Sequence, residues 1–121
     1  MVTLFEQSER SPEVTYDGSE LVIKGRSFMD DAVDFYRNLI ANVSGLDFSS
    51  LEVVVNLDYF NTSSSKCLLE LFRSFEKMVR AGRSVKIFWY YAESCPDLEE
   101  AGEDYRDLLS DVPFELVSVE G

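Results

Sequence analysis

The residues with the clearest chemical potential form a hydroxyl-rich turn at residues 61–66, Asn-Thr-Ser-Ser-Ser-Lys. Serine and threonine oxygens accept hydrogen bonds from the free N–H groups of a helix's first turn, so Ser64 and Ser65 are candidate caps. The same N–H groups and the positive end of the helix dipole favour an anion, such as a phosphoryl group on one hydroxyl. The chemistry of the turn alone leaves both interpretations open, simple helix capping and phosphorylation.

The segments on either side of this turn predict a strand followed by a helix. Residues 51–57 are apolar and rich in valine, as in a buried strand, whereas residues 63–81 repeat apolar side chains at helical spacing. Residues 84–91 are β-branched and aromatic, and they predict the next strand. A strand, helix and strand of these lengths imply a parallel pair with a right-handed crossover. Residues 59–62 and 90–93 should therefore emerge at the same sheet edge, which is our predicted working surface.

The remaining elements complete a single α/β domain spanning residues 1–121. Residues 13–16 and 20–25 flank Asp17-Gly18 and predict a hairpin. A first helix should begin near residues 28–31 and end before Gly45, and a short acidic helix should span residues 97–109, with Gly102 closely packed or at a break. Residues 113–119 predict a last strand, and residues 2–5 allow an additional edge strand. We expect an open mixed sheet of about five strands with about three helices.

The composition excludes most familiar hydrolase mechanisms, although it leaves carboxylate or tyrosine chemistry open. The chain contains no histidine, which removes Ser-His-Asp and Cys-His catalysis and histidine-ligated zinc. Its two cysteines, Cys67 and Cys95, match no metal motif. We therefore expect a protein that is not an enzyme and that uses no metal or cofactor.

The charge pattern is acidic overall, with one basic segment. The net charge of −12 argues against nucleic-acid binding. Residues 66–86 carry six basic and two acidic side chains, which indicates either a solvated helix face, with a Glu76–Arg80 pair, or a docking surface. No run of about 18 apolar residues is present and the first residues lack a signal-peptide pattern, so we expect no membrane segment and a cytoplasmic location.

Three tyrosines lie where the two central strands end. Tyr59, Tyr90 and Tyr91 could form an amphipathic docking rim, because aromatic side chains are enriched at interface centres. The alternative, that members of the aromatic run at residues 89–91 fill the core, is equally consistent with the sequence.

Three segments carry a resemblance to a known family. They are residues 58–66 (Asp-Tyr-Phe-Asn-Thr-Ser-Ser-Ser-Lys), residues 88–91 (Phe-Trp-Tyr-Tyr) and residues 100–105 (Glu-Ala-Gly-Glu-Asp-Tyr). Over nearly its whole length the chain resembles the SiaC family of bacterial regulatory phosphoproteins, and the Asn-Thr-Ser-Ser core is the most specific part. The resemblance implies a STAS-like fold, similar to the anti-sigma-factor antagonists, and phosphorylation of the motif's threonine, which is Thr62.

The resemblance also implies a function and partners. The unphosphorylated protein would bind and activate a diguanylate cyclase, and phosphorylation of Thr62 by a Ser/Thr kinase of the histidine-kinase-like ATPase type would release it; a PP2C-like phosphatase would reverse the step. A homodimer remains open. The residues that we expect at the partner surface are Tyr59, Asn61, Ser63, Ser64, Lys66, Tyr90 and Tyr91.

A second hypothesis belongs to a different class. A STAS-like domain could bind a small molecule or nucleotide, using the helix N-terminus at Thr62 as an anion site. Against this, Tyr59 and Phe60 stand where a phosphate-binding loop would have small residues. Stabilisation of the protein by free nucleotide in a thermal shift would favour this hypothesis over the switch.

Overall fold

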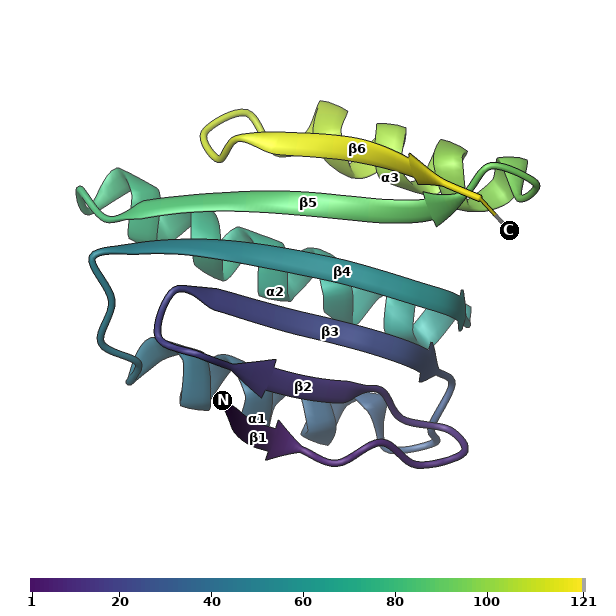
Figure 1. The fold of residues 1–121 in the computed structure, drawn as a ribbon, viewed down its shortest axis with the longest axis horizontal. Helices are drawn as coiled ribbons and strands as arrows, with labels where there is room; N and C mark the ends of the chain where they lie inside the picture. Colours follow the sequence, from purple (N-terminus) through teal and green to yellow (C-terminus); the bar gives the residue numbers. More distant parts are fainter. Residues whose placement is uncertain (121) are drawn as a thin grey trace.

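In the computed structural model, which describes residues 1–120, one mixed sheet of six strands carries three helices (Figure 1). The strands are β1 (Val2–Phe5), β2 (Glu13–Tyr16), β3 (Glu20–Ser27), β4 (Ser50–Phe60), β5 (Ser84–Ala92) and β6 (Phe114–Val119). The helices are α1 (Ala32–Ser44), α2 (Thr62–Arg80) and α3 (Pro96–Leu108). The mixed α/β prediction is confirmed, with β1 as the additional edge strand.

The strands follow one another across the sheet in sequence order. β1, β2 and β3 pair antiparallel, and β3 to β6 pair parallel. The predicted hairpin joins β2 to β3, where the Asp17 carboxylate accepts hydrogen bonds from the N–H groups of Ser19 (3.0 Å) and Glu20 (2.7 Å). These backbone hydrogen bonds lower the pKa of Asp17. Gly18, with φ of +100°, takes the left-handed conformation of the turn.

All three helices lie behind the same face of the sheet in Figure 1. Each helix joins two neighbouring parallel strands, and each step moves in the same direction across the sheet, so right-handed crossovers place every helix on one side. On β4, Leu51, Val53 and Val55 are buried on this helix face. Their neighbours Glu52 and Val54 point to the opposite side, which we call the open face because no helix of residues 1–120 covers it.

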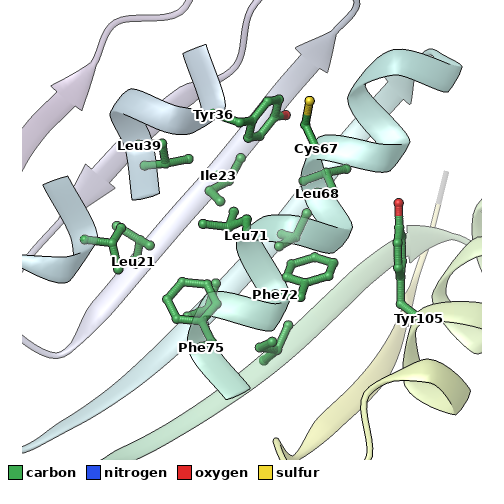
Figure 2. Close-up of a cluster of buried hydrophobic side chains, with 14 of the residues drawn as sticks. Leu21, Ile23, Tyr36, Leu39, Cys67, Leu68, Leu71, Phe72, Phe75 and Tyr105 are labelled. Atoms are coloured by element: carbon green, nitrogen blue, oxygen red, sulfur yellow. The ribbon is translucent and has the colours of Figure 1, made fainter. Parts of the chain in front are cut away.

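The core lies between the sheet and α2. Side chains of α2 pack against α1, which contributes Tyr36 and Leu39, and toward α3, which contributes Tyr105 (Figure 2). The α2 members labelled there are Cys67, Leu68, Leu71, Phe72 and Phe75. Burial raises the pKa of the Cys67 thiol, as expected for an unreactive core residue.

An aromatic cluster joins α3 to β5. Phe72 packs edge-on against Trp89, with ring centroids 6.3 Å apart. Tyr105 packs against the same indole at a tilt, with centroids 5.3 Å apart. The Trp89 indole donates a hydrogen bond to the Leu98 carbonyl oxygen at 2.9 Å. A Cβ at Gly102 would lie 2.5 Å from Trp89 Cδ1. The prediction of close packing at Gly102 is therefore confirmed, and α3 continues through this position without a break.

Candidate functional site

The N-terminus of α2 is capped by an amide side chain rather than by a hydroxyl. Asn61 has an extended backbone (φ −91°, ψ 177°), and its Oδ1 accepts a hydrogen bond from the Ser64 N–H at 2.9 Å. The prediction that Ser64 or Ser65 caps the helix is therefore wrong. Both serines already lie inside the first turn, and their hydroxyls bond elsewhere, that of Ser64 with Ser27 and that of Ser65 with Tyr105.

We expect the substitution Asn61→Ala to lower the free energy of unfolding by about 1 kcal/mol, the usual value of an N-cap side chain. Ser63→Ala changes an exposed hydroxyl two residues after the cap, and it should alter the free energy of unfolding by less than about 0.5 kcal/mol. Urea unfolding of both variants gives the comparison. Equal stabilities for the two variants would show that the amide does not act as the cap.

Ser64 belongs to a buried hydrogen-bond chain beneath the turn. The Ser27 hydroxyl donates to Ser64 Oγ at 2.8 Å and lies 2.6 Å from the hydroxyl of Tyr36. Ser64 Oγ in turn lies 4.0 Å from the sulfur of Met29. Ser27 and Ser64 are both fully buried. Ser64, which we expected at the partner surface, is thus out of a partner's reach, and it fixes α2 against β3 and α1 instead.

Ser65 is held by a residue that the sequence did not single out for the site. The Tyr105 hydroxyl donates to the Ser65 carbonyl oxygen at 2.8 Å and lies 3.0 Å from Ser65 Oγ. Tyr105 therefore fastens α3 to the first turn of α2. Burial raises the pKa of Tyr105 to about 12, although its hydrogen bond with Ser65 acts in the opposite direction.

The raised pKa of Tyr105 predicts a loss of stability in alkali. An unfolded tyrosine ionises near pH 10, whereas Tyr105 in the folded protein keeps its proton to about pH 12. Between these values the folded state binds more protons, so the free energy of unfolding falls as pH rises. Urea unfolding between pH 8 and 11 should show this fall, with a shallower slope for Tyr105→Phe. Identical slopes for the two proteins would show that the loss of stability in alkali does not come from the raised pKa of Tyr105.

Three residues of the motif remain available at the surface. Thr62, Ser63 and Lys66 are all exposed, at the first, second and fifth positions of α2. Thr62 and Lys66 are four residues apart and so lie on the same side of the helix. The first intrahelical bond is the Ser65 N–H to the Asn61 carbonyl oxygen, so the N–H groups of Thr62 and Ser63 have no intrahelical acceptor. This arrangement suits an anion at Thr62.

A bulge in β4 determines where the preceding aromatic residues point. Gly25 of β3 pairs with Leu57, but the next residue, Arg26, pairs with Tyr59, so Asp58 is extra. Phe60 consequently turns to the helix face and packs edge-on against Trp89, with ring centroids 5.7 Å apart. Tyr59 turns to the open face, where 52% of it is exposed.

The structure does not bring the three predicted tyrosines onto one surface. Tyr59 packs edge-on against Phe28, with centroids 5.7 Å apart, at the carboxyl end of β4. Tyr90 also faces the open side, paired in register with Val117 of β6. Tyr91 points to the helix side, and its hydroxyl donates to Glu99 of α3 at 3.1 Å. Of the three, Tyr59 is the residue nearest in the chain to Thr62.

The basic side of α2 is only partly neutralised. Arg80 contacts Glu76 at 3.7 Å, which confirms the predicted pair, and Asp111 at 2.6 Å. Glu76 is buried and also accepts a hydrogen bond from the Asp111 N–H at 3.0 Å. Lys66 forms no ion pair with any of residues 1–120. Arg73 and Lys77 of α2 likewise form no ion pair among the described residues, and of these three cations Lys66 lies nearest in the chain to Thr62.

Two classes of site are not found in the described part of the chain. Residues 1–120 contain no group of three or more cysteine, aspartate or glutamate side chains placed to hold a metal ion. None of the helices described here is both long and apolar enough to cross a bilayer.

Comparisons with known proteins agree with this architecture. A model of the family described as SiaC family regulatory phosphoprotein matches residues 5–119. SiaC of Pseudomonas aeruginosa is 25% identical, with 98% of this chain and 100% of that chain covered and a TM-score of 0.84. An uncharacterized protein of Pseudomonas aeruginosa (strain UCBPP-PA14) is 25% identical over 113 residues, which are 91% of this chain and 89% of that protein.

A further solved structure has the same fold. It is a chain from the crystal structure of the diguanylate cyclase SiaD in complex with its activator SiaC from Pseudomonas aeruginosa, with 22% identity, a TM-score of 0.86 and coverage of 98% of this chain and 100% of that chain. Because the family model spans nearly all of the sequence, the chain belongs to the SiaC family of regulatory phosphoproteins and is a regulator rather than an enzyme.

Proposed function

We propose that this protein is a phosphorylation-switched regulator that binds and activates a diguanylate cyclase while Thr62 is unphosphorylated. Phosphorylation of Thr62 by a Ser/Thr kinase releases the cyclase, and a PP2C-like phosphatase restores binding. The observation that carries the proposal is the position of Thr62, an exposed hydroxyl at the first residue of α2. A related protein, SiaC of Pseudomonas aeruginosa, has been crystallised with the diguanylate cyclase SiaD as its activator, which supports a partner of this class.

The protein's own fold should tolerate a phosphoryl group on Thr62. Such a group adds about −1.5 to −2 charges and three acceptor oxygens. At Thr62 these oxygens meet the N–H groups and the positive dipole end of α2, and Lys66 lies one turn away. Stability and switching are therefore separable: the anion is stabilised by its own helix, but a partner seated over the same helix end would enclose it.

The shape of the surface at Thr62 favours a protein partner over a small ligand. The hollow lined by Phe60, Asn61, Thr62 and Ser65 has a volume of about 220 Å³, below the range of roughly 300–1,000 Å³ that is typical of small-molecule sites. The residues before the helix, Tyr59 and Phe60, are also larger than those of a phosphate-binding loop.

The direct test is intact-mass analysis and site mapping of the protein from its native cells, beside a Thr62→Ala variant. The proposal expects one phosphoryl group on Thr62 in part of the population and none in the variant. Thr62 that stays unmodified under all growth conditions, or a phosphate that persists in Thr62→Ala, would refute it. Co-purification of a diguanylate cyclase with the variant would add support.

A further inference from the structure

We propose that the open face of the sheet is the interface of a symmetric homodimer, in which two copies of this chain pack sheet against sheet around a row of apolar side chains. This inference goes beyond the proposed function and does not rest on it. The row crosses β4 at Val54, six residues before the end of the strand at Phe60. Along a strand this is about 20 Å, so the row lies well away from Thr62.

The apolar row runs across the strands. Val22 of β3, Val54 of β4 and Phe88 of β5 are partners in register, and Tyr90 and Val117 form a second apolar pair beside them. All five side chains are only half-buried, and none belongs to the core of residues 1–120 or packs against it. In Figure 1 this face is turned toward the viewer, and none of the described helices crosses it. The row is therefore apolar surface that the fold itself does not use.

Charged side chains flank the row, with acids on one side and a cation on the other. Toward the amino ends of the parallel strands, Glu20 and Glu52 are partners in register, and neither forms an ion pair with any of residues 1–120. Lys86, the next partner of Glu52, contacts Glu115 instead at 3.9 Å. Toward the carboxyl ends lies Lys24, an exposed cation. Two adjacent carboxylates repel each other, so a cation approaching from outside the chain would stabilise them.

A two-fold axis along the row brings these opposite charges together. Such an axis reverses the strand direction in the second copy, so each side chain of the row meets its own counterpart. Glu20 and Lys24 lie two positions on either side of Val22, and Glu20 of one copy therefore faces Lys24 of the second copy. By the same rule Glu52 faces the amide of Asn56. Each contact occurs twice, as an isologous interface requires, and this self-complementarity identifies a second copy as the occupant.

The open face is large enough for a reversible dimer. Two sheets pack face to face with their strands within about 30° of each other, which an uncovered face allows. At about 4.8 Å between strands and about 3.3 Å per residue, five strands of about seven residues cover roughly 550 Å². Specific interfaces begin at about 600 Å² per partner, and the relief of the side chains adds to the flat area. We therefore expect a dimer that dissociates on dilution through the micromolar range.

The test is the dimer Kd from sedimentation equilibrium of the wild-type protein and its variants. Val54→Lys places a charge in the middle of the apolar row. Val33→Lys is the matched control, because Val33 is an exposed valine (47%) on α1, on the helix side of the sheet. Glu20→Lys and Lys24→Glu are measured separately and as an equimolar mixture. Circular dichroism checks that each variant is folded.

We expect Val54→Lys to raise the dimer Kd by at least about tenfold, the effect of losing an interface anchor. Val33→Lys should change it by less than about twofold, as a surface substitution outside the interface. Glu20→Lys and Lys24→Glu should each weaken the dimer, because each opposes like charges across the axis. Their mixture should dimerise again, because every charge then faces its opposite.

Four results would overturn the homodimer: a wild-type protein that stays monomeric at all concentrations, a dimer that survives Val54→Lys, an equal loss in Val33→Lys, or a mixture that binds no more tightly than its components. None of these measurements involves a cyclase or a phosphate. Failure of the homodimer and failure of the proposed function are therefore distinguishable.

Discussion

Phosphothreonine at position 62 is expected to weaken binding of the diguanylate cyclase by at least about 30-fold while leaving the unfolding temperature of the protein unchanged. An unpaired charge enclosed in an interface costs about 2 to 5 kcal/mol, and about 1.4 kcal/mol corresponds to a factor of ten in Kd. The fold is spared because the phosphate sits at an exposed helix N-terminus, beside N–H groups without intrahelical acceptors. Calorimetric titration and thermal unfolding of both forms provide the two measurements.

The control for this prediction is a second phosphorylated protein with the charge elsewhere. Ser84 is exposed at the start of β5, whereas Thr62 follows the end of β4. Because β4 and β5 are parallel neighbours, the two residues lie at opposite ends of these strands. Phosphoserine at position 84 should change the Kd by less than about twofold. A similar loss of affinity from both phosphates would mean that total charge, rather than the position of Thr62, governs binding.

Replacement of Gly102 by alanine should destabilise the protein by about 1 to 3 kcal/mol, the usual result of overpacking a core. In an open helix the same change stabilises by up to about 1 kcal/mol, so the sign itself is informative. At Gly102 the new Cβ would lie 2.5 Å from Cδ1 and 2.8 Å from Nε1 of Trp89. The indole cannot easily retreat, because it is hydrogen-bonded to the Leu98 carbonyl oxygen and packed among Phe72 and Tyr105.

Gly45→Ala is the matched control, since Gly45 has a helical backbone (φ −93°). A new Cβ there would lie 3.7 Å from its nearest neighbour, the Asn42 carbonyl oxygen, which is an ordinary van der Waals contact. Gly45→Ala should leave the free energy of unfolding unchanged or raise it slightly. Urea unfolding of Gly45→Ala and Gly102→Ala compares their free energies of unfolding. A gain of stability from Gly102→Ala would contradict the close contact between α3 and Trp89.

Local sequence signals predicted the elements that position the site. The Asp-Gly turn, the valine run at residues 51–57 and the helical repeat after Thr62 each specify one element by short-range chemistry, and all three are confirmed. Gly82 ends α2 as predicted: it has φ of +94°, and its N–H bonds to the Val79 carbonyl oxygen. These signals also placed Thr62 at the strand-to-helix junction.

Features that depend on contacts between distant segments could not be predicted in this way. The bulge at Asp58 reverses which of Tyr59 and Phe60 is buried, and it arises from pairing with β3. Ser64 has the same local sequence signal as its neighbours, yet it is buried by hydrogen bonding to Ser27, 37 residues earlier. Tyr105 reaches Ser65 only because α3 packs beside α2. Each of these requires the assembled sheet and helices.

The most direct test of the switch is the synthesis of cyclic diguanylate by the cyclase from the same genome, titrated with unphosphorylated protein and with protein carrying phosphothreonine at position 62. We predict saturable activation by the unphosphorylated form and none by the phosphorylated form at the same concentrations. Equal activation by both forms, or activation by the phosphorylated form alone, would contradict the account.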